Sequence, residues 1–417
     1  MVFLSVHTLP TLHWSGCPLA LGLCERGKEL PSLSIVLSTH CFGLQPKCCP
    51  PGAVGGSTSF LQTTSGRKTR QPGSSKGLGS VMYRKEKSIL LKDSSLALYN
   101  NLSVLPLPGK QLTYFASVHG STVNLVSASD DGLGFSHRLL QAKESSLGMG
   151  ASIITQAAWC VLPSRILLVL TSRKGVQMYE SDGSVMVYWH ALDGLESSPG
   201  NAAFARGVAA AGRRFVCVGV SSGSILVFDV PPKGTNITLS EVLGKHRAAI
   251  TDIGPELCVQ PEGSADLVTA DDAGALCAWR SGEKFELVSH VPVSGCPCSS
   301  VKLWNGVIAA GFGNGQIRLY EAASGALQAE VSAHARWIYA LDVAPQSGKL
   351  LSAAEDSFLQ VWRLNHNLDA EAIEIEHCHG ECVTDTLLCG ARFCNPEGTA
   401  FAVTGFELSE IIRYVQA

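Results

Sequence analysis

The chain has 417 residues, of which 46% are hydrophobic and 16% are charged, so it can bury the core of one large domain or two ordinary ones. Its formal net charge is −3, but residues 1–81 carry seven basic and two acidic residues, whereas the remainder carries 25 basic and 33 acidic ones. An acidic body repels phosphate backbones, which excludes nucleic acid from the expected partners. No apolar run reaches the roughly 18–20 residues of a membrane span.

The cysteine usage points to a reducing compartment. Fifteen cysteines are an odd number in a long chain, and several of them, such as Cys160, Cys217 and Cys277, lie in segments with the pattern of core strands. Buried free cysteine behaves as a small hydrophobic side chain, and disulfides are rare in the cytosol. We therefore predict a cytoplasmic protein.

The first 81 residues show no sustained hydrophobic period, and from Gln45 onward they are rich in Pro, Gly, Ser and Thr. Such a segment cannot bury enough apolar surface to offset the entropy lost on ordering. The composition changes sharply at Val81–Met82, where alternating segments begin. We predict a disordered low-complexity extension over residues 1–81 and a single patterned domain over residues 82–417.

The patterned domain contains an internal repeat. Six segments of alternating apolar residues end in an aromatic residue, and these aromatics lie 49, 51, 41, 42 and 52 residues apart: Tyr179, Phe228, Trp279, Tyr320, Trp362 and Tyr414. Alternation with period two predicts strands, and a repeat of about 40–50 residues is typical of a β-propeller. We predict seven four-stranded blades, with strands a to d running from the central channel outward, over residues 99–141, 153–191, 204–242, 249–291, 299–331, 337–377 and 383–415.

The last predicted blade lacks its outer strand, because the chain stops after the strand at 410–415. The one strand-like segment left unassigned is 87–91, in which Ile89 and Leu91 share one face. We predict that it pairs with 410–415, which covers an open sheet edge and closes the ring with an N-terminal strand.

The segment 333–364 (AHARWIYALDVAPQSGKLLSAAEDSFLQVWRL) closely resembles the WD-repeat family. The resemblance extends over residues 82–417 and is also carried by ADLVTADDAG at 265–274, GFGNGQIRLYEAASG at 311–325 and EHCHGECVTDTLLCGARFC at 376–394. It implies a structural tetrad, which is a chain of hydrogen bonds from an aspartate through a histidine and a hydroxyl to an indole. The family positions fall on His334, Ser352, Asp356 and Trp362.

A partial tetrad is implied in blade four by His246, Thr269 and Trp279. The b–c turn there reads DDAG, so Ala273 occupies the position at which the family has aspartate. We expect Asp272 to take its place.

Two short motifs suggest chemistry, and both have a structural interpretation. GVSSG at 219–223 matches a hydrolase nucleophile elbow, but a strand follows it where the elbow needs a helix. HCHGEC at 377–382 has zinc-ligand residue types, but it lacks the close C-x-x-C pairs of a closed zinc site. We interpret CHG as the d–a loop of blade six, with His379 as a degenerate tetrad residue. We predict no catalytic residue, no metal and no cofactor.

The resemblance implies a platform that binds other proteins and performs no catalysis. Loops on a rigid scaffold are where such proteins bind, so we expect partners on the face that carries the d–a loops and b–c turns. Arg247, Arg336 and Trp337 are the candidate anchors there, although Trp337 could equally pack within strand a. The alternative is a small-ligand binder or enzyme that uses the central channel, which needs several titratable groups on strands that read as mostly apolar. Self-association stays possible, and the sequence does not identify the partner.

Overall fold

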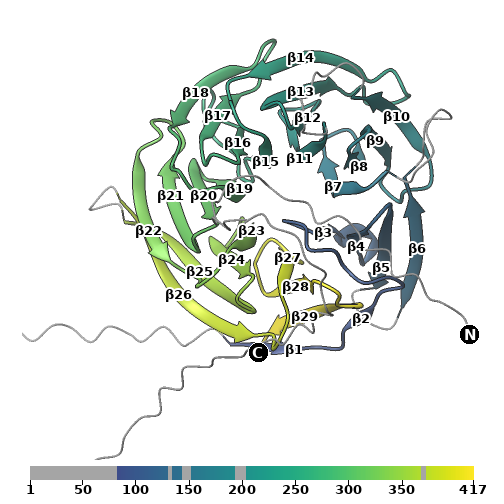
Figure 1. Cartoon of the computed structure of the whole chain (residues 1–417), viewed down its shortest axis with the longest axis vertical. Helices are drawn as coiled ribbons and strands as arrows, with labels where there is room; N and C mark the ends of the chain where they lie inside the picture. Colours follow the sequence, from purple (N-terminus) through teal and green to yellow (C-terminus); the bar gives the residue numbers. More distant parts are fainter. Residues whose placement is uncertain (1–81, 130–133, 143–151, 193–202, 368–371) are drawn as a thin grey trace, which may run out of the picture. The chain divides into compact units, whose positions relative to one another are not determined.

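The computed structural model describes residues 82–129, 134–142, 152–192, 203–367 and 372–417. These residues form seven antiparallel sheets arranged as a ring, which is the predicted seven-bladed β-propeller (Figure 1). Residues 1–81 lie outside the described part, so the expected disorder and the domain boundary stay predictions. The one helix among the described residues is the three-residue 3-10 turn η1 (Pro108–Lys110), and no helix there is long and apolar enough to cross a membrane.

The strands of blades one to four follow, in chain order from the innermost strand outward. They are β3 (Ser103–Leu107), β4 (Leu112–His119), β5 (Thr122–Ser129) and β6 (Phe135–Gln141); β7 (Ile154–Val161), β8 (Ile166–Ser172), β9 (Gly175–Glu180) and β10 (Met186–Ala191); β11 (Ala205–Ala211), β12 (Phe215–Val220), β13 (Ser224–Asp229) and β14 (Thr238–Gly244); and β15 (Ile250–Pro255), β16 (Leu267–Asp271), β17 (Leu276–Arg280) and β18 (Glu286–Val291).

Blades five to seven continue the ring. They are β19 (Cys298–Trp304), β20 (Val307–Phe312), β21 (Gln316–Glu321) and β22 (Leu327–Ser332); β23 (Ile338–Ala344), β24 (Lys349–Ala354), β25 (Phe358–Asn367) and β26 (Ala372–Cys382); and β27 (Leu388–Phe393), β28 (Ala400–Gly405) and β29 (Glu410–Gln416). The end of the ring that carries the b–c turns and d–a loops is called the upper face below, and the opposite end the lower face.

The hydrophobic core lies between the blades. Each of the seven apolar clusters joins two neighbouring sheets; for example, Phe228 of blade three packs with Met178 of blade two, and Phe312 of blade five packs with Leu276 of blade four. Strands alternate their side chains between two faces, so a strand buried on both sides reads as nearly continuous apolar sequence. This explains why β16 and β17 carry the run of Leu, Val, Ala, Cys and Trp that the repeat search detects.

The ring is closed by the N-terminal segment, as predicted. β2 (Ile89–Leu90) pairs with β29 through Ile89 opposite Ile411, with Ile89 only 1% exposed and Leu90 70% exposed. The closure is more extensive than expected, because β1 (Tyr83–Lys85) also pairs with β29. The cluster between blades seven and one contains Ile89 and Leu91 beside Phe115 of blade one. The two ends of the chain therefore complete one sheet and one inter-blade core.

The start of blade one differs from the prediction. The innermost strand was expected to begin at Tyr99, but β3 begins at Ser103, and residues 98–101 cross the upper end of the central channel. Asn100 adopts a left-handed backbone conformation with φ of 53°, which breaks the strand. Its N–H donates to the Tyr339 carbonyl at 2.9 Å, and its side-chain oxygen accepts from Ser300 Oγ at 3.0 Å. The segment 98–101, called the plug below, therefore contacts blades five and six from the opposite side of the ring.

Candidate functional site at the two ends of the channel

The tetrad residues of blade six are joined in one hydrogen-bonded chain. Nδ1 of His334 lies 3.2 Å from a carboxylate oxygen of Asp356, and Nε2 lies 2.8 Å from Ser352 Oγ. The same hydroxyl accepts from Trp362 Nε1 at 3.0 Å. Burial raises the pKa of Asp356, but the hydrogen bond and charge of His334, together with the Ala335 and Phe358 N–H groups, outweigh it and leave that pKa below its ordinary value. Every member has its partner, which is the condition under which a buried polar chain stabilises a fold.

Blade four has the same chain with a different aspartate. His246 Nε2 lies 2.7 Å from Thr269 Oγ1, which accepts from Trp279 Nε1 at 2.9 Å. Nδ1 lies 2.9 Å from Asp271, so the prediction of Asp272 was wrong. Thr269 and Asp271 are two residues apart, and Asp271 closes β16, so both side chains lie on the same face.

Asp272 instead belongs to the surroundings of the plug. Burial and the neighbouring charge of Asp271 raise its pKa, whereas the charge of Arg206 opposes that rise. Arg206 is 4% exposed in the innermost strand of blade three, and it donates to the Tyr99 carbonyl at 2.8 Å. Its guanidinium also lies 4.8 Å above the Tyr99 ring. The interpretation of the sequence missed this residue, although a lone arginine in the otherwise apolar strand ARGVAAA was the available signal.

The three candidate anchors lie on the upper face, and one of them, Trp337, contacts the plug. Arg247 and Arg336 are exposed, and neither has a hydrogen bond or ion pair among the described residues. Trp337 is half-buried and stacks on Tyr99, with ring centroids 5.9 Å apart and an angle of 15° between the planes. The Tyr339 ring also packs against Tyr99, with ring centroids 4.8 Å apart. The structure therefore leaves the two arginines free, whereas it uses part of the Trp337 surface to hold the plug.

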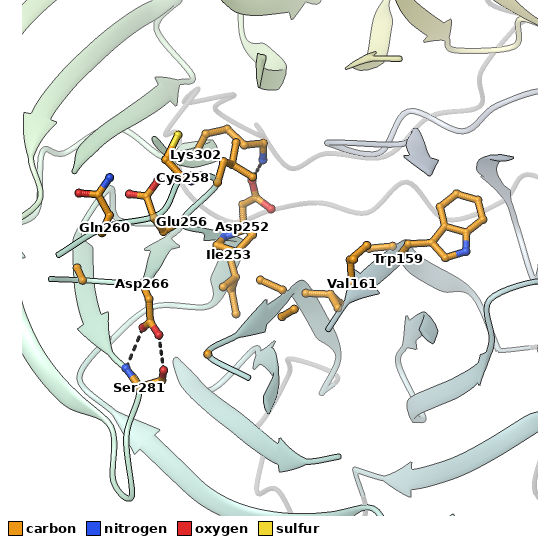
Figure 2. Close-up of a pocket in the computed structure, with 18 of the residues that line it drawn as sticks. Trp159, Val161, Asp252, Ile253, Glu256, Cys258, Gln260, Asp266, Ser281 and Lys302 are labelled. Carbon is orange, nitrogen blue, oxygen red and sulfur yellow. Dashed lines mark hydrogen bonds and ion pairs between the residues drawn. The ribbon is translucent and has the colours of Figure 1, made fainter. Parts of the chain in front are cut away.

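The opposite end of the channel is a cavity of about 840 Å³ that reaches the lower face. Residues from the innermost strands of all seven blades line it. Figure 2 shows part of this lining, including Trp159, Asp252 and Lys302. These strands were expected to be mostly apolar, but they bring two charged pairs into the cavity. Lys302 Nζ lies 3.3 Å from Asp252, and Arg392 lies 3.0 Å from Asp342. Charged residues spaced far apart in sequence give no local pattern, so the sequence does not reveal these pairs.

The carboxylates of both pairs also accept hydrogen bonds from backbone N–H groups. Asp252 accepts from the Val301 N–H at 2.9 Å as well as from Lys302, and Asp342 accepts from the Phe393 N–H at 2.8 Å. Burial lowers the pKa of Lys302, and Asp252 opposes that shift. The pairs therefore cross-link the innermost strands of adjacent blades, and neither supplies a free acid or base.

The HCHGEC segment is not a loop. It lies at the end of β26, with His379 opposite Val361 of β25, so the prediction of a degenerate tetrad histidine in a d–a loop was wrong. The His379 ring packs against Tyr83 at 5.3 Å. Among the residues that the structure describes, no group of three or more His, Cys, Asp or Glu side chains is arranged to hold a metal ion.

Comparison with known proteins agrees with this architecture. The family model WDR54 matches residues 82–417. The mouse protein called WD repeat-containing protein 54 is 57% identical over 333 residues, which make up 80% of this chain and 99% of the mouse protein, and the human protein of that name is 56% identical over the same shares. The predicted resemblance to the WD-repeat family is confirmed.

Solved structures share the fold at low sequence identity. A chain of the mitotic checkpoint complex matches with a TM-score of 0.60 and 16% identity, covering 86% of this chain and 98% of that chain. The WD40 β-propeller domain of Doa1 matches with a TM-score of 0.56 and 14% identity, covering 80% and 97%. At such identities the likeness concerns the fold alone.

Proposed function

The chain belongs to the WDR54 family of WD-repeat proteins, and on that basis we propose that it is a non-catalytic scaffold that binds other proteins on its upper face. The observation that carries the proposal is the pair Arg247 and Arg336, which are exposed on the upper face and have no partner among the described residues. Exposed arginines beside a half-buried tryptophan are favoured anchors of protein interfaces.

We propose that this scaffold acts in the cytoplasm. We also propose that it binds neither a cofactor nor nucleic acid. The ten described cysteines are all free, and Cys160, Cys217, Cys277, Cys298 and Cys389 are buried. Desolvation raises the pKa of the Cys160 and Cys389 thiols to about 12, so these groups stay protonated and inert. Free, buried cysteines of this kind support a reducing compartment such as the cytoplasm.

The test is affinity capture with the full chain and with the variant Arg247→Glu/Arg336→Glu. Proteins bound through the upper face should be recovered with the wild type and lost with the variant. Arg213→Glu/Lys284→Glu is the matched control, because both residues are exposed and lie in loops of the lower face. The proposal fails if the upper-face variant retains every protein that the wild type recovers, or if the control loses the same proteins.

A ligand of the central channel is the second candidate, and the cavity of about 840 Å³ favours it. Ligand pockets typically measure about 300–1,000 Å³. Because Asp252 and Asp342 are engaged in pairs, the proposal is restricted to binding. Soaking crystals with a fragment library decides the matter: ordered fragments between Lys302 and Trp159 support it, and a cavity that stays empty throughout the library rejects it.

A further inference from the structure

A second region of the upper face, over blades six and seven, carries exposed aromatic rings and acidic side chains. It consists of Phe358 and Phe406 together with Glu355, Asp385 and Glu407, and is called the acidic–aromatic patch below. Phe358 is 43% exposed and Phe406 is 42% exposed. Large apolar groups that stay exposed beside polar residues are typical of binding surfaces. The patch contains none of the anchors discussed above.

The three turns that form the patch are connected by backbone hydrogen bonds. The b–c turn of blade six meets the loop after β26 where the Val383 N–H donates to the Ser357 carbonyl at 2.9 Å. That loop meets the b–c turn of blade seven where the Phe406 N–H donates to the Leu387 carbonyl at 2.8 Å. Val383 and Leu408 also pack on the core between the two blades. The backbones of the three turns therefore form one supported ledge.

Each of the three turns keeps a side chain at a position where the backbone is left-handed. Ser357, Asp385 and Glu407 have φ of 70°, 53° and 59°. The b–c turns of blades three, four and five have glycine in that conformation, at Gly223, Gly274 and Gly315. A left-handed conformation is unfavourable for residues with a Cβ, so the turns over blades six and seven retain strain that glycine would relieve. Two of the three side chains retained in this way are acidic.

The three turns carry a local excess of acidic residues. Glu355, Asp385 and Glu407 have no ion pair or side-chain hydrogen bond among the described residues, and residues 355–358, 383–387 and 406–408 contain no Lys, Arg or His. Three carboxylates on one ledge repel one another, and a cation placed among them would relieve that repulsion. Two exposed phenylalanine rings offer apolar area, and their faces attract cations.

We infer that the acidic–aromatic patch binds a segment of a partner protein in which Lys or Arg residues alternate with large apolar residues. The cations would lie beside Glu355, Asp385 and Glu407, and the apolar side chains would lie on Phe358 and Phe406. The inference rests on the proposed scaffold role but not on Arg247 and Arg336, which have the opposite charge. The upper face would then bind partners through two sites of opposite charge, the arginine pair and the acidic–aromatic patch.

The test measures binding of a fluorescent peptide, Phe-Lys-Leu-Lys-Phe-Lys, to the full chain by anisotropy. The wild type should bind it, with affinity falling as salt rises, and should not bind the counterpart in which Glu replaces each Lys. Glu355→Gln/Asp385→Asn/Glu407→Gln and, separately, Phe358→Ser/Phe406→Ser should each weaken binding about tenfold or more, since interface energy is concentrated in a few residues. Four of the five substituted side chains are exposed and Glu355 is half-buried, so circular dichroism is used to confirm that the variants fold.

The matched control is Glu262→Gln/Glu283→Gln/Glu397→Gln, which removes three exposed carboxylates from loops of the lower face. It should bind the peptide as the wild type does, and so should Arg247→Glu/Arg336→Glu. The inference is overturned if the wild type fails to bind, if the Glu peptide binds equally well, or if the control loses as much affinity as the patch variants. A mass that doubles with concentration in the wild type but not in the patch variants would assign the surface to a second copy of this chain instead. Failure of the upper-face arginine variant alone concerns the proposed function and leaves this inference intact.

Discussion

The ammonium group of Lys349 lies 3.2 Å from the hydroxyl of Tyr83, although the two residues are 266 positions apart in the chain. Lys349 begins the second strand of blade six, and Tyr83 begins the N-terminal strand on blade seven. The same ammonium donates to the Gly398 carbonyl at 3.0 Å and to the Gln416 side chain at 2.9 Å. One buried lysine therefore holds the N-terminal strand, the C-terminal strand and the neighbouring blade together.

Replacing Lys349 with Met should lower the free energy of unfolding by about 1–3 kcal/mol, because it leaves buried acceptors without their donor. Lys87→Met is the matched control, since Lys87 is exposed and has no partner among the described residues; its effect should stay within about 0.5 kcal/mol. Urea unfolding measures both. Equal effects of the two variants would show that the contact does not contribute to ring closure.

Replacing Ile89 or its neighbour Leu90 with alanine tests ring closure, because the same kind of truncation is made at a buried and at an exposed position of β2. Ile89→Ala should destabilise the protein by about 2–5 kcal/mol, because Ile89 is 1% exposed in the core between blades seven and one. Leu90→Ala should have little effect, because Leu90 is 70% exposed. Thermal unfolding distinguishes them.

Truncation tests the same closure on a larger scale. A chain beginning at residue 93 lacks β1 and β2, which leaves the edge of β29 open, so it should give far less soluble protein than a chain beginning at residue 82. Similar yields and melting temperatures for the two chains would contradict the closure.

Replacing each of the two aspartates of blade four with asparagine should affect stability differently. Asp271→Asn should lower stability by about 1–3 kcal/mol, because Asp271 accepts from His246 and from the Ala273 and Ala275 N–H groups. Asp272→Asn should be neutral or stabilising, because folding raises the pKa of Asp272 and therefore disfavours its charged form at neutral pH. Denaturant midpoints at pH 7 measure the pair, and a loss only in the Asp272 variant would contradict the assignment.

His334→Ala should destabilise blade six by about 1–3 kcal/mol, because it leaves Ser352 and Asp356 without the ring between them. His290→Ala is the control, since His290 is exposed on an outer strand. Calorimetry of both variants measures the difference. An unchanged melting temperature for His334→Ala would mean that the tetrad adds nothing to stability.

The pH dependence of the same tetrad follows from Asp356. Folding depresses its pKa below the ordinary value of 3.8, so its ionised form stabilises the native state above that value, and the contribution disappears as the pH falls through the folded pKa. The gap in melting temperature between the wild type and Asp356→Asn should therefore be largest near neutral pH and close below pH 3.8. A gap that widens on acidification would reverse the assigned sign.

The family and the number of blades follow from local patterns that a sequence displays. Strand alternation, the spacing of residues such as Trp279 and Trp362, and the order of His334, Ser352 and Asp356 within one repeat all depend on neighbours inside a single sheet. The alternation of Ile89 with Leu90 likewise sufficed to predict the closing strand, because the exposed and buried faces of a strand differ at every second residue. The family match confirms the WD-repeat prediction, and the sheet pairing confirms the seven blades and the closing strand.

What only the tertiary structure decided lies where distant residues meet at the axis of the ring. The plug places Asn100 against Ser300, which is 200 residues away, and Tyr99 against Arg206, which is 107 residues away. The same holds for the Lys302–Asp252 pair. No periodicity relates these residues, because each blade contributes its innermost strand independently and only closure of the ring brings the side chains together. The choice of Asp271 over Asp272 has a local cause instead, because the alternation of faces at the end of β16 places Asp271 on the same face as Thr269, within reach of His246.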